Sequence, residues 1–470
     1  MNYYGKIILK ADLELISPLM IGSGESEISD RDILLNKEDK PYIPASSFMG
    51  KLYNELSSDK KKKYFGQKKV EENDKNEEEN KAESNKFEHQ SYIICDDLHL
   101  SDDSVKNTAI RDGIRINPET GLVEKGAKFD YQVLEPGNHF ALEMSINVEP
   151  DDNYNDCKEL MKNIVNVLSN RQFALGGKTS SGFGNLQAQN IKVMEYDFAD
   201  KKQAAAYLLK KETENLFSEY IEENPMLNDE FRINASFQIV NSFLIRSYSK
   251  TPYGSDATQI KCGDKFVLPG TSLRGALRAR AQKILNLLWE NKKDEVDMFI
   301  AALFGTTSLE KKNEYSVPSS LYVSETVIDN VECQLQNRIQ IDRFTGGTIE
   351  SALFDSMPVF PVPNDEAQLV NLTLTIHKPL PSQKGLLLLL LKDLYTSELP
   401  IGGEKNVGRG LLKGTKATVT NGDQSIHFSN FEDIDEATQK LFNQYIEALI
   451  SKSDNEAIEE YIAKFKKAKA

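Results

Sequence analysis

A tandem repetition constrains the fold of this chain more than any other feature. Four segments of its first half return in the second half, in the same order and 225 or 226 residues later: 43–50 as 268–275, 114–121 as 339–346, 129–130 as 354–355, and 175–184 as 401–410. Four colinear matches at nearly one spacing indicate that a whole domain has been duplicated. The 470 residues therefore predict two domains, 1–225 and 226–470, each large enough to bury its own core.

Each half shows the same order of predicted elements. An alternating strand opens it, at 6–16 and at 232–243, and a helix follows a Pro-X-Ser/Thr-Ser start in which Ser or Thr is available as the N-cap. Two strands, a second helix, a Gly-rich loop and a closing strand come next. The order strand, helix, strand, strand, helix, strand predicts an α+β fold class, with two tandem ferredoxin-like (RRM-like) domains.

Three further segments fall outside this repeated order. We expect a disordered acidic insert at about 67–88, a helical connector at 204–223 and a C-terminal helical extension at 434–467. The insert explains much of the net charge of −15, since 71–84 alone holds seven acidic residues against two lysines. Net charge argues against a nucleic-acid partner, but the repeated motifs carry Arg and Lys, so RNA stays open as a partner.

Several other classes of protein are disfavoured. The longest apolar run, 386–391, is too short to span a bilayer, and no signal segment opens the chain. Cys95, Cys157, Cys262 and Cys333 are scattered without a CxxC pair, which argues against zinc and against a disulfide framework. We therefore expect a cytoplasmic protein without a membrane partner.

The repeated motifs suit phosphate groups. A helix start exposes free N–H groups, and the second copy adds Arg274, Arg278 and Arg280 behind it. The Gly-rich loops lack side chains, so they suit either a tight turn or a close approach to another backbone, such as RNA. A Walker A interpretation of the first loop fails, because the glycine that motif requires five residues before Gly177 is Gln172.

These motifs together resemble the RAMP superfamily, in particular the filament-forming backbone subunits of type III CRISPR effector complexes. The second copy resembles the family at four places, a Pro-Gly-Thr-Ser-Leu-Arg-Gly helix start, a Phe-Gly pair, an Ile-Asp-Arg-x-Thr-Gly segment and a Gly-rich loop: 269–275, 304–305, 341–346 and 402–410. The first copy is looser, with Asn117-Pro118 in place of Asp-Arg and Met49 in place of a basic residue. Two such domains in one chain resemble the fused double-backbone subunit of type III-D systems.

The resemblance implies a guide-RNA groove and a thumb hairpin in each domain, for which 122–134 and 347–359 are the candidates. Its partners would be a CRISPR guide RNA, a complementary target RNA and other type III effector subunits. The RNA-binding residues carried over onto the repeated motifs are Ser46, Ser47, Lys51, Arg115, Lys178, Ser180, Thr271, Ser272, Arg274, Arg278, Arg338, Arg343, Lys405 and Arg409.

The resemblance also implies metal-dependent cleavage of target RNA at regular intervals, with the RNA 2′-OH as the nucleophile. A loop Asp promotes the reaction, and Mg²⁺ or another divalent cation is required, with Asp30 and Asp256 as its possible ligands beside RNA phosphates. Asp256 lies 13 residues before Pro269; in the first copy Asp30 is preferred and Asp32 is the substitute, because Asp32 adjoins an apolar run.

Two interpretations of the chain stay open. It is either an endoribonuclease subunit or a catalytically inert RNA-binding filament subunit, and inertness is expected first in the first domain. A guide-RNA-processing endonuclease of the same superfamily is disfavoured, because the five histidines are unpaired in sequence.

Overall fold

The chain divides into two compact units. The computed structural model describes residues 5–24, 30–56, 64–68, 87–89, 91–101, 104, 107–117, 120–149, 154–170, 173–221, 230–247, 254–290, 292–306, 316–362 and 370–467. The first unit comprises Met1–Ile110, Asp130–Gly177 and Gly184–Met226; the second comprises Arg111–Phe129, Lys178–Phe183 and Leu227–Ala470. Two short segments of the first repeat therefore belong to the second unit.

The first unit is built on a five-stranded antiparallel sheet. Its strands, in spatial order, are β12 (Phe173–Ala174), β13 (Asn185–Asp197), β1 (Gly5–Leu15), β11 (His139–Val148) and β7 (Ile93–Cys95). Two helices, α1 (Ala45–Glu55) and α3 (Tyr154–Asn170), contribute apolar side chains to the core of the sheet. Counted from β1, the four principal strands have the order 4-1-3-2, which is the ferredoxin-like arrangement.

The second unit repeats this sheet. Its strands, in spatial order, are β19 (Leu321–Val323), β25 (Val370–His377), β14 (Glu230–Ile239), β26 (Leu412–Asn421) and β27 (Gln424–Phe428). The counterparts of β7, β11, β1 and β13 follow one another in the same order. The α+β class and the tandem ferredoxin-like folds predicted from the sequence are therefore confirmed.

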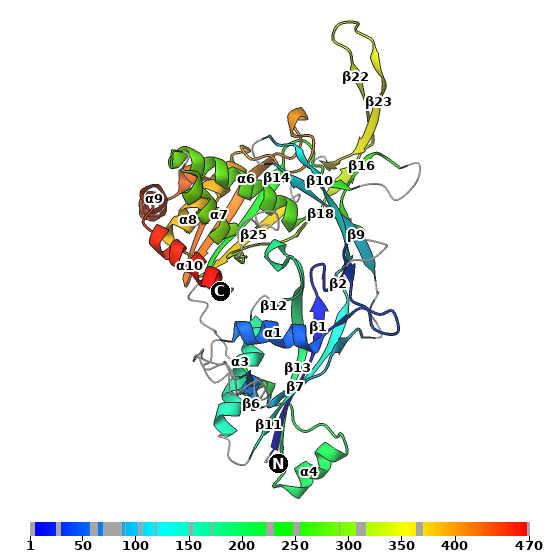
Figure 1. The fold of residues 1–470 in the computed structure, drawn as a ribbon, viewed down its shortest axis with the longest axis vertical. Coiled ribbons are helices and arrows are strands. Elements are labelled where there is room, and N and C mark those ends of the chain that lie inside the picture. Colours follow the sequence, from blue (N-terminus) through cyan, green and yellow to red (C-terminus); the bar gives the residue numbers. More distant parts are fainter. Residues whose placement is uncertain are drawn as a thin grey trace, which may run out of the picture. The chain divides into compact units, whose positions relative to one another are not determined.

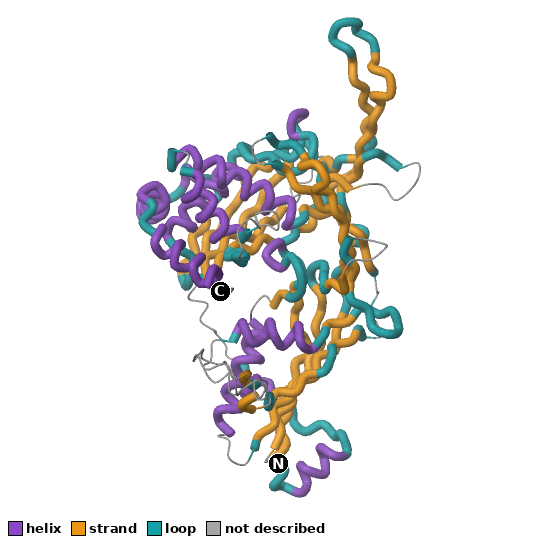
Figure 2. Tube along the Cα trace, in the orientation of Figure 1, coloured by secondary structure: helices purple, strands orange, loops and turns teal. Residues whose placement is uncertain are grey.

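Five helices gather on one side of the second sheet (Figures 1 and 2). They are α6 (Gly270–Leu288), α7 (Lys293–Phe304), α8 (Pro381–Tyr395), α9 (Glu436–Ser451) and α10 (Asn455–Lys467). Their apolar faces meet in one core, to which α9 contributes Leu449 and α10 contributes Ile462. The C-terminal extension predicted from the sequence is thus the pair α9 and α10, and it is an integral part of the second unit.

Each repeat also carries a two-stranded hairpin after its second sheet strand. The first hairpin is β9 (Thr108–Ile116) with β10 (Val123–Leu134), and the second hairpin is β22 (Gln336–Ile341) with β23 (Thr348–Met357). Figure 1 shows the second hairpin standing away from its own sheet. These hairpins contain the segments predicted as thumbs.

The Thr-Gly motifs form the turns of these hairpins. Asp342 Oδ1 accepts hydrogen bonds from the backbone N–H groups of Phe344 and Thr345, at 2.7 and 3.1 Å, and Gly346 has a positive φ of 69°. In the first repeat Asn117 Oδ1 accepts from Thr120 at 3.1 Å, and Gly121 has a φ of 70°. An Asx-type turn needs a side-chain oxygen rather than a charge, so Asn serves as well as Asp.

Two sequence expectations were wrong in detail. The N-cap residues of α1 and α6 are Pro44 and Pro269, and no side-chain cap forms because the proline ring has no hydrogen-bond acceptor. The connector is not one helix: α4 (Lys201–Leu208) and α5 (Phe217–Tyr220) are separated by non-helical backbone. Most of the acidic insert lies outside the described residues, and its two ends form the paired strands β5 (Gln67–Lys68) and β6 (Phe87–His89).

The remaining strands are short and connect the elements above. They are β2 (Gly22–Gly24), β3 (Asp32–Ile33), β4 (Tyr42–Ile43), β8 (Leu98–His99), β15 (Arg246–Ser247), β16 (Ala257–Gln259), β17 (Lys261–Cys262), β18 (Lys265–Leu268), β20 (Thr326–Val327), β21 (Val331–Cys333) and β24 (Val359–Pro361). Of these, β16 pairs in parallel with β23, so the loop before β16 meets the base of the second hairpin.

Candidate RNA-binding and cleavage site

A reciprocal pair of aspartates joins the loop before β16 to the second hairpin. The backbone N–H of Asp256 donates to Asp355 Oδ1 at 2.7 Å, and the backbone N–H of Asp355 donates to Asp256 Oδ2 at 3.1 Å. The parallel pairing of Ala257 with Ser356 places the two residues side by side. The predicted loop acid therefore lies at the base of the hairpin, next to a second carboxylate.

The first repeat contains the same arrangement. Asp30 N–H donates to Asp130 Oδ1 at 2.9 Å, and Asp130 N–H donates to Asp30 Oδ2 at 2.9 Å. Asp32 instead lies in β3, paired with Gly24. The counterpart of Asp256 is thus Asp30, as the sequence preferred, and the one-residue slip is absorbed in the loop. We call the two aspartate pairs, Asp30 with Asp130 and Asp256 with Asp355, the aspartate clasps.

The clasps suit a hard divalent cation. Each loop aspartate uses one carboxylate oxygen in the clasp, and within the described part of the chain its other oxygen accepts no hydrogen bond. Mg²⁺ is commonly held by one or two carboxylates together with substrate phosphate oxygens. No group of three or more His, Cys, Asp or Glu side chains suited to a metal occurs among the described residues, so phosphate would have to complete the coordination.

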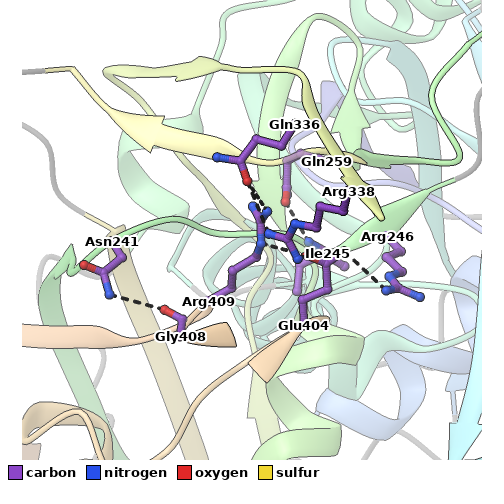
Figure 3. Close-up of polar contacts among 9 residues, drawn as sticks. All are labelled: Asn241, Ile245, Arg246, Gln259, Gln336, Arg338, Glu404, Gly408 and Arg409. Carbon is purple, nitrogen blue, oxygen red and sulfur yellow. Dashed lines mark hydrogen bonds and ion pairs between the residues drawn. The ribbon is translucent and has the colours of Figure 1, made fainter. Parts of the chain in front are cut away.

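A second charged cluster lies at the base of the second hairpin, centred on Glu404 (Figure 3). Its carboxylate meets Arg246 at 3.3 Å, Arg338 at 2.7 Å and Arg409 at 2.8 Å. Gln336 Oε1 accepts from Arg409 at 2.6 Å and from Arg338 at 3.2 Å. Three guanidinium groups around one carboxylate leave a local excess of positive charge.

The three arginines of this cluster differ in exposure. The side chain of Arg246 is 56% exposed, that of Arg338 is 26% exposed and that of Arg409 only 2%. Burial lowers the pKa of Arg409, and the neighbouring Glu404 opposes that shift. Arg246 and Arg338 are therefore the members open to a phosphate group, whereas the buried Arg409 is held by Glu404.

The first repeat uses the corresponding positions differently. Lys178 stands where the second loop has Glu404, and its Nζ lies 4.8 Å from the ring centre of Phe129. Arg111 stands where the second hairpin has Gln336, and it forms a buried ion pair with Glu325 at 2.5 Å. Arg111 also lies over the ring of Phe183. All of these residues belong to the second unit.

Two arginines predicted to bind RNA are engaged within the second unit. Arg274 donates to the carbonyls of Ser180 and Leu321 at 2.9 and 3.0 Å, and also to the carbonyl of Phe304. Arg278 donates to the carbonyl of Gly305 at 2.8 Å. Burial, with Arg278 nearby, lowers the pKa of Arg274 to about 10. Both cations thus satisfy carbonyls at the C-terminal end of α7, where Phe304 is buried and Gly305 has a positive φ of 72°.

The other predicted RNA-binding residues lie in three settings. Ser46, Arg343 and Lys405 are exposed, whereas Ser47, Ser180, Thr271 and Ser272 are half-buried. Lys51 pairs with Glu55, and Arg115 pairs with Glu124 at 3.2 Å. At the start of α1, Asp97 already accepts the N–H of Ala45 at 2.8 Å. RNA contact by any of these residues stays a prediction.

The glycines of the two loops are explained by contacts within the protein. A Cβ on Gly184 would lie 1.8 Å from the carbonyl oxygen of Leu175, and one on Gly410 would lie 1.9 Å from that of Ile401. Both residues also have positive φ. Of the two interpretations left open by the sequence, a tight turn against the chain's own backbone accounts for these positions.

Sequence reasoning missed five residues of the site. They are Asp130, Asp355, Arg246, Gln336 and Glu404. A signal for the first two was present, since Phe129-Asp130 and Phe354-Asp355 repeat at the common spacing. For Arg246 and Gln336 there was none, because neither belongs to a repeated motif.

Fold and site define a protein with two ferredoxin-like domains in tandem, each with a hairpin that is clasped to an aspartate loop. The chain belongs to the RAMP superfamily, which matches residues 12–187 and 236–413, one match in each repeat. This membership supports a role in RNA binding. No curated protein matches the chain. Among the helices of the described residues, none is long and apolar enough to cross a membrane.

Proposed function

We propose that this chain is a guide-RNA-binding backbone subunit of a type III CRISPR effector complex, in which each aspartate clasp promotes cleavage of the target RNA. The observation that carries the proposal is the repetition of the clasp. Two copies with otherwise different side chains both hold a loop carboxylate against the base of the hairpin. The fused double-backbone subunit of type III-D systems is the particular member that the two repeats resemble.

The chemistry follows from the position of the carboxylates. The 2′-oxygen of a target nucleotide attacks the adjacent phosphorus and the P–O5′ bond breaks, which gives a 2′,3′-cyclic phosphate and a 5′-oxygen that takes a proton from water to become a 5′-hydroxyl. Asp256 accepts the proton of the attacking hydroxyl, and Asp355 fixes the loop that carries Asp256. A Mg²⁺ ion held by these carboxylates and by phosphate oxygens would neutralise the charge that develops on the phosphate.

The RNA backbone needs exposed cations near the clasps. In the second repeat Arg246 and Lys405 are exposed and Arg338 is half-buried beside Arg246, while the exposed Arg343 lies in the hairpin turn, away from the clasp. The hairpins themselves expose large apolar side chains, such as Leu353 at 71% and Leu122 at 69%. Exposed apolar groups on a projecting hairpin suit stacking or wedging against bases.

The test uses the full effector complex, loaded with guide RNA and a labelled complementary target, in Mg²⁺ and in EDTA. The variants are Asp256→Asn, Asp256→Ala, Asp30→Asn and Asp30→Ala, with Asp32→Asn as the matched control outside the clasp. We expect each clasp variant to remove its own cut and Asp32→Asn to remove none. A full product ladder from all four clasp variants would refute the catalytic assignment.

The clasp also favours a second candidate function, an inert RNA-binding scaffold. A loop aspartate that accepts a backbone N–H from the hairpin has a structural reason to be present without chemistry. The pair of substitutions at position 256 separates the two functions, because Asn can still accept the N–H of Asp355 but carries no charge. A scaffold predicts that Asn behaves as the wild type while Ala weakens guide binding; a catalyst predicts that both abolish the cut.

A further inference from the structure

The Gly-rich loop of the first repeat packs against the start of α6 within the second unit. We call this contact surface at the start of α6 the seat. The carbonyl of Ser180 accepts from Arg274 at 2.9 Å, and Ser181 is only 7% exposed. The fit at Gly270 is close: a Cβ there would lie 2.2 Å from the carbonyl oxygen of Ser181. This seat therefore requires a glycine at the helix start and an arginine four residues later.

The loop of the second repeat has the same backbone shape. Its αL residue Glu404 has φ and ψ of 55° and 35°, against 60° and 23° for Lys178, and Gly408 matches Gly182 at 81° and 19° against 86° and 10°. Each pair brackets a short 3₁₀ helix, η1 (Thr179–Ser181) or η2 (Lys405–Val407). The second loop is therefore preformed for the same kind of seat.

The second loop is open, however. Lys405 and Asn406 are exposed, and Val407, the counterpart of the buried Ser181, is 53% exposed. A Cβ on Gly182 would lie 2.5 Å from the backbone nitrogen of Glu325, whereas one on Gly408 would meet only the Asn241 side chain, at 3.7 Å. The apolar side chain of Val407 is thus exposed, although the matching residue of the first loop, Ser181, is buried.

A second copy of this chain does not offer the matching seat. Its α6 start is already occupied by its own first loop. At the start of its α1, Ala45 stands in place of Gly270 and Met49 in place of Arg274. A methyl group at the Gly270 position clashes with the incoming carbonyl, and Met cannot donate to it. One feature of the seat recurs in the first repeat, since Ser91 and Ser319 make the same hydrogen bonds to their strand carbonyls.

We propose that the loop Glu404–Gly408 is a docking surface for a different RAMP-type subunit, whose first helix starts with Pro-Gly and carries an arginine four residues after the glycine. Ala45 and Met49 prevent the chain from docking onto itself. Assembly at this loop therefore requires another protein. This inference concerns protein assembly and does not rest on RNA binding or cleavage.

The test builds the missing seat into the first repeat of the full, RNA-free chain. The acceptor variant is Ala45→Gly with Met49→Arg, and Val407→Asp is the variant that blocks the loop. By light scattering after gel filtration, we expect wild type to be monomeric and the acceptor variant to self-associate. Adding Val407→Asp to the acceptor should weaken that association at least about tenfold.

A mixing experiment separates docking from misfolding. Wild type mixed with the chain that carries all three substitutions should give a one-to-one complex, since the first supplies only the loop and the second only the seat. Circular dichroism and a thermal melt check that each variant is folded. An acceptor variant that is folded but stays monomeric, or a wild type whose self-association Val407→Asp abolishes, would overturn the proposal.

Discussion

The two Gly-rich loops share one backbone and differ in almost every side chain. In the first loop, Lys178 lies over the ring of Phe129 and forms no part of the buried ion pair nearby, which joins Arg111 and Glu325. In the second, Glu404 gathers three arginines. Duplicated backbones keep their shape when glycines and carbonyl contacts specify it, so side-chain charge is free to diverge. The aspartate clasps, by contrast, are the same in both repeats.

The largest expected difference between the repeats is in cleavage. Asp256→Asn should reduce the cut assigned to the second repeat by at least about 100-fold, because loss of a general base costs roughly 10²–10⁴ in rate. The cut assigned to the first repeat should be unchanged in this variant, and Asp30→Asn should do the reverse. The measurement is single-turnover cleavage of a target labelled at each end. Equal loss of both cuts from either variant would contradict two independent sites.

The next largest effect concerns the charge at the loops. Glu404→Gln leaves the buried Arg409 without its carboxylate, and breaking a buried ion pair costs about 3 kcal/mol. Lys178→Gln at the matching position of the first repeat removes the half-buried cation over Phe129 and should cost about 0.5–1 kcal/mol. Urea unfolding measures both. Similar losses from the two variants would show that the cluster does not stabilise the second unit.

A smaller effect, equal in the two repeats, is expected at the loop glycines. Gly184→Ala and Gly410→Ala each place a methyl group against a carbonyl at positive φ, and we expect a loss of roughly 1–3 kcal/mol from each. Gly275→Ala in α6 is the matched control, since nothing lies within 4 Å of its added Cβ. That change should stabilise the protein by about 0.5–1 kcal/mol. A fall in melting temperature for Gly275→Ala as large as the falls for Gly184→Ala and Gly410→Ala would contradict the close-contact explanation.

The smallest effect is expected on the hairpins. Leu353→Ser and Leu122→Ser replace exposed side chains, so the free energy of unfolding should change by less than about 0.5 kcal/mol. If the hairpins contact bases, affinity for the guide–target duplex should fall by a few fold in each variant. Filter binding at fixed salt measures this, because salt strongly changes RNA affinity. Unchanged affinity in both variants would remove the hairpins from the RNA interface.

Much of the fold followed from the sequence because the repetition supplied two independent copies of every pattern. Alternating strands and helix starts that agree in both halves outweigh the ambiguity of either half alone. The helix caps were predicted wrongly, since Ser and Thr are the usual capping residues and here the prolines occupy the N-cap. The loop aspartate was found as a position in sequence, but its partner in the clasp comes from a strand about 100 residues away.

The sequence by itself determined that the chain is a tandem α+β protein of two ferredoxin-like halves, with a loop acid and a Gly-rich loop in each half. Local patterning and spacing are sufficient for such features. Only the tertiary structure decided which basic residues are available. Arg409 and Arg274 carry the same charge as Arg246. Arg409, however, is buried, and Arg274 donates its hydrogen bonds to backbone carbonyls. Exposure and partnership depend on packing between distant segments, and a motif does not specify that packing.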